Sequence, residues 1–432
     1  MRERPTLVVI GAGSSSFGLS ALRELYGEPA LSGSTVWLVD LDAERIARTA
    51  QVAAAFEDAS GRGITIRCTT DRTEALPGAD AVIVAVEVDR QNRWEQDAAI
   101  TRRHGVRSVL AENAGPGGLA HALRTIPLVF EIARDVQQLA PDAWLFNFTN
   151  PEGRICTALH RYLPDVRAVG LCHEVRIAED RHGTRLGRTR EQLRWRAGGL
   201  NHITALLACT DATTGDDLTP SLRHSLDALL TDEYEGPTHR LVDHLQRAWG
   251  TVVATTDNHV GEYLAFAADH CPIEDVTAWG GGIRDAEEAL AAAVVGRAFD
   301  LAPLLAAPPI EALVPILRAL VTQDPSRIAS VILPNDGLLP QLPAACAVEV
   351  SATATANGPV GDVSADLPAP LVDVLVAEVA IQQLVADAAI TGSRDAALKA
   401  LRLDPGVGSE ATAQALLDDF EATHSDLWPA LT

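Results

Sequence analysis

The N-terminal third of the chain alternates short apolar runs with segments of helical periodicity. The apolar runs are continuous and rich in β-branched residues, which is typical of strands that are buried on both faces of a parallel sheet. They lie at 6–10, 36–40, 81–86 and 144–148. Helical spacing follows them at 19–26, 42–59 and 118–140. This alternation predicts an α/β fold with a doubly wound parallel sheet.

The pattern changes after about residue 200. A strand is expected at 203–209, and a stretch rich in Gly, Pro, Ala and Thr, at about 335–365, interrupts the rest. The remaining regular structure is expected to be helical, at 218–230, 237–249, 285–300, 310–322, 368–390 and 394–402. We therefore expect two domains, a doubly wound domain over 1–200 and a mixed α+β, largely helical domain over 201–432.

Composition and charge narrow the class of protein. Hydrophobic residues make up 47% and charged residues 22% of the 432 residues, as in ordinary globular domains. The 58 acidic and 35 basic side chains give a formal charge of −23, which repels phosphate backbones, so nucleic-acid binding is not expected. No apolar run is judged to reach the roughly 20 residues that cross a bilayer, and the start of the chain does not resemble a signal peptide. Six irregularly spaced cysteines indicate a reducing compartment, so we expect a cytoplasmic protein with no membrane partner.

A glycine-rich turn joins the first strand to the first helix. Gly11, Gly13 and Gly18 depart from the strict Gly-x-Gly-x-x-Gly spacing, because Ser16 holds the third position. Glycine lets such a turn close and brings a helix N-terminus to a pyrophosphate. Asp40 ends the second strand, where a carboxylate accepts hydrogen bonds from a ribose diol and disfavours a 2′-phosphate. The turn predicts a Rossmann-like domain that binds NAD rather than NADP, and the alternative is an ordinary tight turn with a helix cap.

Two further segments place polar groups at the expected carboxyl edge of the sheet. The stretch 111–118, Ala-Glu-Asn-Ala-Gly-Pro-Gly-Gly, precedes a predicted helix. Asn147 and Asn150 flank the end of the fourth strand, and amides there suit sugar hydroxyls, which need both donors and acceptors. The alternative is ordinary turn chemistry, because Asn-Pro and Pro-Gly form turns wherever they occur.

Cys172, in Gly-Leu-Cys-His-Glu, and His202, in Gly-Leu-Asn-His, are candidate metal ligands. One thiolate and one imidazole are too few for a closed structural zinc site, but they suit a catalytic divalent ion that keeps positions for substrate or water. The alternative is a buried cysteine and a satisfied core histidine. A later segment gathers four titratable side chains in nine residues, Asp257, His259, Glu262 and Tyr263.

Taken in order, these segments resemble glycoside hydrolase family 4, the NAD- and metal-dependent glycosidases. The segments that carry the resemblance span almost the whole chain: GAGSSSFG, VWLVDLD, AGPGGLAHALRTIP, NFTNPEG, GLCHE, GLNH, HVGEY and AAITGSRDAALKALRLDP. The combination of AGPGG with ALRTIP, NFTNP and GLCH is specific. The motifs are similar to those of the α-galactosidase and α-glucuronidase branch, or of a sister group such as the NAD-dependent sulfoquinovosidases.

The resemblance implies an oxidoreductive hydrolysis of a small α-glycoside. NAD takes a hydride from C3 of the sugar, the resulting ketone acidifies the C2 proton, and a side-chain base removes that proton. The aglycone leaves from C1 by elimination, water adds, and NADH returns the hydride. A divalent metal, typically manganese, chelates the C2 and C3 oxygens. The family departs in this way from the glycosidases that use two carboxylates.

The resemblance also implies residue roles by position. Cys172 and His202 are expected to hold the metal. Contacts to NAD are expected from Gly11, Gly13, Ser14, Ser15, Phe17, Asp40, Glu87 and Asn150. Contacts to the sugar are expected from Arg90, Arg93, Asn113, Asn147, Asn150, Cys172 and His173.

Two positions carry the acid–base expectations. His173 follows the metal cysteine where members acting on phospho-sugars have Asp or Asn, so it is the expected general acid, with a positioning hydrogen-bond donor as the alternative. For the base that removes the C2 proton, Asp257 is the first choice, and His259 and Tyr263 are the alternatives.

The chain departs from the family's pattern at three places, which indicates a divergent branch. Glu152 replaces an apolar residue, Asn113-Ala114 replaces paired threonines, and Glu174 replaces a small polar residue. Arginines cluster at 90–107 and at 176–196. One or two of them could clamp an acidic group at C6 of the sugar, as in a glucuronide or a sulfoquinovoside, whereas most are expected in salt bridges.

Rival functions stay open at this point. A neutral α-galactosidase or α-glucosidase would use the same mechanism. An NAD-linked hydroxy-acid dehydrogenase of the malate or lactate type would share the nucleotide-binding domain, and a non-catalytic NAD sensor is a third interpretation. The family forms homodimers and homotetramers, for which the apolar C-terminal helices could supply the interface.

Overall fold

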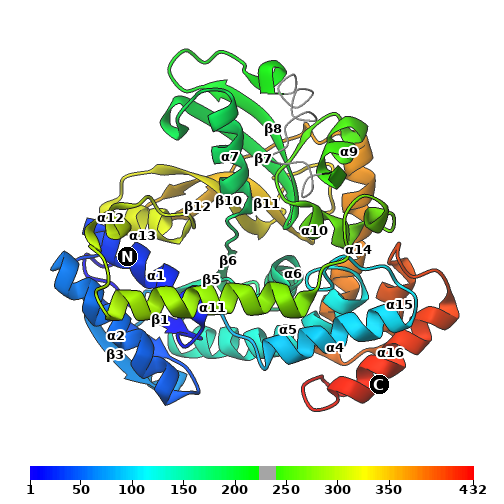
Figure 1. Cartoon of the computed structure of the whole chain (residues 1–432), viewed down its shortest axis with the longest axis horizontal. Helices are drawn as coiled ribbons and strands as arrows, with labels where there is room; N and C mark the ends of the chain where they lie inside the picture. Colours follow the sequence, from blue (N-terminus) through cyan, green and yellow to red (C-terminus); the bar gives the residue numbers. More distant parts are fainter. Residues whose placement is uncertain (223–239) are drawn as a thin grey trace.

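A computed structural model of the chain describes residues 1–222 and 240–432, and it leaves the side chains of residues 15–17 undescribed (Figure 1). Most of the helix expected at 218–230, and the start of the one expected at 237–249, lie outside the described residues. The other expected helices of the second half are present, although the one expected at 285–300 spans Val276–Val295.

The N-terminal half forms a six-stranded parallel sheet in the order β3-β2-β1-β4-β5-β6. Its strands are β1 (Thr6–Ile10), β2 (Thr35–Val39), β3 (Thr65–Thr69), β4 (Ala81–Val84), β5 (Trp144–Asn147) and β6 (Arg167–Gly170). The helices of this half are α1 (Ser15–Gly27), α2 (Ala43–Ser60), α3 (Arg72–Ala75), α4 (Arg90–Arg103), α5 (Gly115–Leu139) and α6 (Glu152–Tyr162). The predicted doubly wound α/β fold is confirmed, and β3 and β6 are additional to the four predicted strands.

The sheet continues without a break into the second half, in the order β6-β10-β11-β7-β8-β9. These strands are antiparallel: β7 (Leu193–Leu200), β8 (Ile203–Asp211), β9 (Val252–Val253), β10 (Ser326–Pro334), β11 (Ala347–Thr355) and β12 (Gly358–Gly361), which pairs with β11. The stretch at 335–365, expected only to interrupt helices, therefore contributes two strands, a correction to the sequence pattern. The domain boundary expected at residue 200 falls in the turn of the β7–β8 hairpin.

The junction between the two parts of the sheet depends on a glycine. Ile332 of β10 pairs with Gly170, the last residue of β6. A Cβ at Gly170 would lie 2.6 Å from Sγ of Cys156 and 2.9 Å from Cβ of Ile332. Both distances are shorter than side-chain atoms tolerate, so any larger residue would push β10 away from β6.

Helices cover this continuous sheet (Figure 1). The second half contributes α7 (Glu174–Arg185), α9 (Arg240–Trp249), α10 (Asp257–Val260), α11 (Val276–Val295), α12 (Ala302–Ala306) and α13 (Leu313–Thr322). The C-terminal helices α14 (Ala369–Thr391), α15 (Arg394–Leu403) and α16 (Glu410–His424) return to the first half, where they pack against α4, α5 and α6. The two halves are thus joined by helices as well as by the sheet.

The expectation that no segment is long and apolar enough to cross a membrane is wrong on length and composition. α14 has 23 residues, and an 18-residue window within it has a mean hydropathy of 1.6. It packs against α5, α6 and α15 and buries Leu375, Val379 and Val385. Those contacts assign α14 to the core of the fold.

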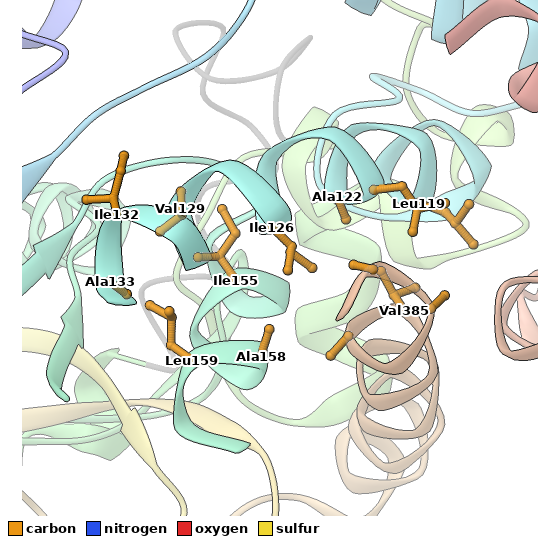
Figure 2. Close-up of a cluster of buried hydrophobic side chains, with 14 of the residues drawn as sticks. Leu119, Ala122, Ile126, Val129, Ile132, Ala133, Ile155, Ala158, Leu159 and Val385 are labelled. Carbon is orange, nitrogen blue, oxygen red and sulfur yellow. The ribbon is translucent and has the colours of Figure 1, made fainter. Parts of the chain in front are cut away.

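The core between α5, α6 and α14 follows helical spacing (Figure 2). Figure 2 shows side chains from one face of α5 above those of α6 and α14: Leu119, Ala122, Ile126, Val129, Ile132, Ala133, Ile155, Ala158, Leu159 and Val385. Their spacing of three and four residues along α5 is that of a helix with one buried face. This core fixes α5, whose first turn borders the candidate site described below.

Replacing Ile126 by Ala should lower the free energy of unfolding by about 2–5 kcal/mol, because it leaves a cavity in a fully buried position. Ile126→Val removes one methylene group and should cost about 0.5–1.5 kcal/mol. Urea unfolding followed by tryptophan fluorescence measures both. Equal costs for the two variants would contradict the tight packing of α5 on α6 and α14.

Candidate functional site

The turn between β1 and α1 has the geometry that the glycine pattern predicts. Gly11 has φ of +87°, and a Cβ there would lie 2.0 Å from the carbonyl oxygen of Ala85. The backbone N–H of Gly13 donates to Oδ2 of Asp40 at 2.9 Å. The first amides of α1 and the Asp40 carboxylate therefore meet at one turn, the arrangement that receives a pyrophosphate and a ribose. This turn fits a dinucleotide.

Three other predicted NAD contacts lie in the same turn. Ser14 immediately precedes α1. Ser15 and Phe17 lie in the first turn of α1, but their side chains are outside the described part of the structure. Their backbone position agrees with the predicted contacts, which stay a prediction.

The loops after β4 and β5 meet at the carboxyl edge of the parallel sheet. Thr149 Oγ1 accepts a hydrogen bond from the backbone N–H of Val86 at 3.0 Å. Asn147 is fully buried, its amide donates to the carbonyl of Thr149 at 2.9 Å, and its Oδ1 has no hydrogen-bond partner. Asn150 lies half-buried, with its amide nitrogen 3.5 Å from Oε1 of Glu112. The predicted sugar-binding amides therefore share one edge with the nucleotide turn.

Cys172 and His202 come together from distant elements. Cys172 lies just beyond the end of β6, and His202 lies in the turn of the β7–β8 hairpin with φ of +62°. Sγ of Cys172 lies 3.5 Å from Nε2 of His202. Tetrahedral coordination with the sulfur and nitrogen bond lengths of a zinc site would place these two atoms about 3.6 Å apart. The pair therefore fits two ligands of one divalent cation.

The protonation of the pair depends on that cation. Burial, with the nearby His259, lowers the pKa of His202 to about 3, so the imidazole is in the neutral form that binds metals. Burial, with Glu349 and Glu152 nearby, raises the pKa of the Cys172 thiol well above its ordinary value. A bound cation offsets that effect, because it stabilises the thiolate. Within 1–222 and 240–432 no cluster of three or more His, Cys, Asp or Glu side chains is arranged to hold a metal.

His259 and Glu174 complete the surroundings of this pair. The ring centroids of His202 and His259 lie 4.4 Å apart. Oε2 of Glu174 accepts a hydrogen bond from the hydroxyl of Thr255 at 2.9 Å. Burial alone would raise the pKa of Glu174, but His259 and the hydrogen bond from Thr255 help to lower it below its ordinary value. Glu174, a departure from the family's pattern, thus adds a negative charge beside the expected cation.

Glu112 is a site residue to which sequence reasoning gave no role. Its Oε1 pairs with the Arg90 guanidinium, and Arg90 also pairs with Glu87 at 3.0 Å. Burial alone would raise the pKa of Glu112, but Arg90 and His121 lower it to about 2. Arg90, a predicted sugar contact, therefore forms ion pairs with both Glu87, a predicted NAD contact, and Glu112. Two acids neutralise the charge of Arg90.

Arg93 is placed elsewhere. Its guanidinium pairs with Asp426 at 2.5 Å and donates to the carbonyl of Thr423 at 3.3 Å, near the end of α16. Those partners give Arg93 the salt-bridge role that was the alternative for most of the arginines. The structure does not group it with Cys172 and His202.

His173 has a partner that no motif indicated. Its Nδ1 lies 2.8 Å from Oε1 of Glu311, which precedes α13. Mainly through this hydrogen bond, Glu311 raises the pKa of His173 to about 9. The imidazolium therefore carries a proton at neutral pH, and its side chain is half-exposed. An acid that must protonate a leaving group needs both properties.

Two of the three candidate bases make other contacts. Oδ1 of Asp257 accepts the backbone N–H of Val242 in the first turn of α9, at 2.9 Å. The hydroxyl of Tyr263 donates to the carbonyl of Asn201 at 3.0 Å, and burial raises its pKa well above the ordinary value. Of the three, His259 is the one beside His202. Helix capping accounts for Asp257, the first choice from the sequence.

Two buried acids lie behind the cysteine. Glu349 on β11 accepts hydrogen bonds from Ser330 at 2.7 Å and Thr204 at 3.0 Å, and burial raises its pKa to about 7. Glu152, the second departure from the family's pattern, accepts the backbone N–H of Leu171. Burial, together with Glu349, raises the pKa of Glu152 well above its ordinary value. Glu152 begins α6, at the carboxyl edge of the parallel sheet, and Glu349 lies on β11. The two acids come together because β10 and β11 continue that sheet from β6.

Comparison with known proteins decides which activity this geometry serves. Residues 6–184 match the model described as family 4 glycosyl hydrolase, and residues 197–407 match the model of the C-terminal domain of that family. The chain belongs to glycoside hydrolase family 4. The resemblance stated from the motifs is confirmed. This family 4 enzyme is a glycosidase and not the hydroxy-acid dehydrogenase of the alternative interpretation.

The relatives of this family 4 glycosidase differ in substrate. An α-glucosidase from Erwinia rhapontici is 31% identical, with 98% of each chain covered. An α-galacturonidase from Bacillus subtilis is 28% identical, with 96% of each chain covered. A crystal structure of a 6-phospho-α-glucosidase from gut microorganisms, in complex with NAD and Mn²⁺, has a TM-score of 0.84 at 21% identity and covers 99% of this chain and 100% of its own. Homologues in the family therefore bind NAD and Mn²⁺.

A second group of buried charged residues consists of Arg154, Glu378 and Asp404. Arg154, on α6, is almost completely buried, and its Nη2 lies 3.5 Å from Oε1 of Glu378 on α14. Asp404, which follows α15, accepts the backbone N–H of Gly406 at 2.8 Å. Burial raises the pKa of Glu378 to about 7 and that of Asp404 to about 6. One arginine thus faces two acids whose charged forms are unfavourable in the folded state.

Replacing Glu378 by Gln should change how stability depends on pH. Because the folded state binds the Glu378 proton more tightly than the unfolded state does, wild-type stability falls as the pH rises from the unfolded value of 4.5 through about 7. Gln does not titrate, so the free energy of unfolding of Glu378→Gln should increase relative to wild type between about pH 5 and about pH 8. Urea titrations across this range measure the difference. The exposed Glu131→Gln should show no such trend, and an equal trend in both variants would contradict the assignment.

Proposed function

We propose that this glycosidase hydrolyses an α-glycoside with NAD as a catalytic cofactor and with a divalent cation on Cys172 and His202. The observation that carries the proposal is the 3.5 Å approach of these two ligands. They meet where the loop after β6 reaches the β7–β8 turn. When bound, NAD would accept and return a hydride at C3 of the sugar, and the cation would polarise the C2 and C3 oxygens.

The chain's own residues supply the remaining steps. His259 takes the C2 proton, because its ring borders His202 and its buried Nδ1 has no hydrogen-bond partner. His173, held by Glu311, donates a proton to the oxygen that leaves C1. Water then adds across C1 and C2: His173 accepts a proton from the water as its oxygen bonds to C1, and the protonated His259 returns a proton to C2. The proton that leaves C2 and the proton that reaches the aglycone are therefore handled by different side chains.

Amide groups orient the sugar in this proposal. Asn150 presents its amide at the carboxyl edge of the sheet. Asn113 and Asn147 each have a buried side-chain oxygen without a hydrogen-bond partner. Acceptors of this kind suit sugar hydroxyls, because a buried polar atom without a partner is costly until a ligand satisfies it.

We propose further that the sugar carries an acidic group at C6, as in a uronide or a sulfoquinovoside. Arg181 supports this choice. It lies on α7 seven residues after Glu174, on the same helix face, with Ile177 between them. Arg181 makes no hydrogen bond and no ion pair within the described residues, although Glu174 acts on it electrostatically, and it is half-buried. A half-buried arginine whose guanidinium is not held by an ion pair is suited to a carboxylate or a sulfonate.

A neutral α-glucoside is the second candidate. The α-glucosidase from Erwinia rhapontici, at 31% identity over nearly the whole chain, favours it. Nitrophenyl α- and β-glycosides, neutral and acidic at C6, assayed with NAD and manganese, distinguish the two. A glycosidase of this mechanism releases the aglycone without accumulating NADH and incorporates solvent deuterium at C2. Cleavage that is undiminished in enzyme freed of NAD would refute the proposal.

Replacing Cys172 by Ser should lower the affinity for Mn²⁺ at least about tenfold, because the hydroxyl is a poorer anionic ligand than the thiolate. Turnover should fall with it, whereas NAD affinity should stay within about twofold, since the β1–α1 turn is unchanged. Isothermal titration measures both affinities. Cys68→Ser, at an exposed cysteine, is the matched control. Full turnover of Cys172→Ser without added metal would show that Cys172 is structural.

Replacing Arg181 by Gln should lower kcat/KM for the C6-acid glycoside by about 10- to 100-fold, the magnitude of a hydrogen bond between charged groups. The rate on the matching neutral glycoside should change by less than about twofold. Arg188→Gln, at an exposed arginine 3.7 Å from Asp211, should affect neither substrate. Equal losses of Arg181→Gln on both glycosides would contradict recognition of the C6 group.

A further inference from the structure

Glu262 is a buried acid that the proposed chemistry does not use, and burial, with Glu112 nearby, raises its pKa to about 8. It lies in the 3₁₀ turn η3 (Gly261–Tyr263) of the C-terminal half, directly after α10. Oε2 accepts the backbone N–H groups of Glu112 and Asn113, the latter at 2.8 Å, and approaches that of Ala114 at 3.4 Å. Oε1 accepts the Asn113 side-chain amide at 3.2 Å. One carboxyl group therefore binds three consecutive amides of a loop about 150 residues away.

That loop needs an external acceptor. It leads into α5, whose N-cap residue Ala114 provides no side-chain cap. Ala111 and Gly115, which flank the loop, have positive φ of 62° and 67°. The amides of residues 112–114 precede the helix and are buried, so they would lack an acceptor if Glu262 were absent. Glu262 thus supplies, from the other half of the chain, the acceptor that this loop lacks.

The same loop places the side chains of Glu112 and Asn113 near the predicted sugar and metal contacts. Glu112 lies beside Asn150 and Arg90 and acts electrostatically on His202. Asn113 presents a buried Oδ1 without a partner. A shift of the loop backbone by about 1 Å would move both groups, and misplacements of this size can cost about 100-fold in rate.

Tyr263, the residue after Glu262, contacts the β7–β8 turn that carries His202. Tyr263 donates its hydroxyl to the carbonyl of Asn201, the residue before His202. His259, one turn earlier, borders the ring of His202. A segment of five residues therefore contacts both the ligand turn of the β7–β8 hairpin and the loop that leads into α5.

We propose that Glu262 is a positioning residue: its carboxyl group clamps the backbone of residues 112–114 and so sets Glu112 and Asn113 against the sugar. The inference rests on the proposed function, because it takes the loop to line the glycoside site. It adds a role that acts through other residues, since Glu262 itself touches neither ligand of the expected cation.

The test uses the full-length enzyme with Glu262→Gln and Glu262→Ala. Gln is isosteric and keeps one oxygen for the amides, whereas Ala removes both. Hydrogen exchange at the amides of 112–114 should speed up at least about tenfold in Glu262→Ala and less in Glu262→Gln. The substrate is whichever nitrophenyl glycoside the wild type cleaves in the assay described above. For it, kcat/KM should fall about 100-fold in Glu262→Ala, with partial rescue in Glu262→Gln. NAD affinity should not change.

Glu57→Gln is the matched control, because Glu57 binds the backbone N–H groups of Gly63 and Ile64 at 2.7 and 3.0 Å in a surface turn. It should lose stability without losing turnover per folded molecule. Asn113→Ala combined with Glu262→Ala should be less impaired than the product of the two single losses, because both act through one loop. If Glu262→Ala does not fold, Glu262→Gln carries the same comparison.

Three results would overturn the inference. The first is unchanged exchange at 112–114 in the Glu262 variants, which would show that no clamp exists. The second is faster exchange with no loss of turnover beyond that of Glu57→Gln, and the third is fully multiplicative losses with Asn113→Ala. Failure of the proposed function would look different, since no glycoside would then be cleaved by the wild type, whereas the exchange data would still report on the clamp.

Discussion

The candidate site depends on one pairing, the contact of β6 with β10. A parallel sheet places the loops that follow its strands along one edge, which accounts for the nucleotide turn after β1 and the amides after β5. It cannot by itself bring His202 there. The antiparallel β10 and β11 continue the sheet from β6 to β7, so the loop that carries Cys172 and the hairpin that carries His202 belong to one sheet. The close packing at Gly170 keeps that junction tight.

The second constraint is electrostatic. A chain with formal charge −23 buries several acidic side chains near the two ligands, and their surroundings differ. Arg90 keeps the pKa of Glu112 low, and His259 keeps that of Glu174 low. Hydrogen bonds alone do not offset burial, which raises the pKa of Glu262 to about 8 and that of Glu349 to about 7. The remaining negative potential favours a cation at Cys172 and His202, which supports the fit inferred from their separation.

Local signals in the sequence predicted the parallel strands and the nucleotide turn, because continuous β-branched runs and a glycine turn depend on neighbouring residues. β3 escaped prediction because it is largely exposed, and β6 because its sequence, Arg-Ala-Val-Gly, has a single β-branched residue. β11 lies in a stretch whose Gly, Pro, Ala and Thr content indicates loops, yet packing on both sides makes it a strand. Tertiary context outweighed propensity in each case.

The site divides in the same way. Cys172 and His202 stand within recognisable motifs, and the structure brings them together. Glu311 reaches His173 across 138 residues and Glu262 reaches the loop into α5 across about 150, and a single carboxylate in a sequence carries no mark of such a contact. Asp257 shows the opposite error, because its place in a segment dense in titratable groups suggested a base, while its carboxylate caps α9.

The buried acids also restrict how an acidic sugar can lie. Glu112 and Glu174 flank the ligand pair and would repel a carboxylate or sulfonate placed beside them. C6 lies across the pyranose ring from C2 and C3, so a sugar whose C2 and C3 face the cation directs its C6 group away from these acids. Arg181 lies about 10 Å along α7 from Glu174, by the rise of seven helical residues. The charge pattern therefore orients an acidic sugar in one way, whereas a neutral sugar feels neither the repulsion nor the attraction.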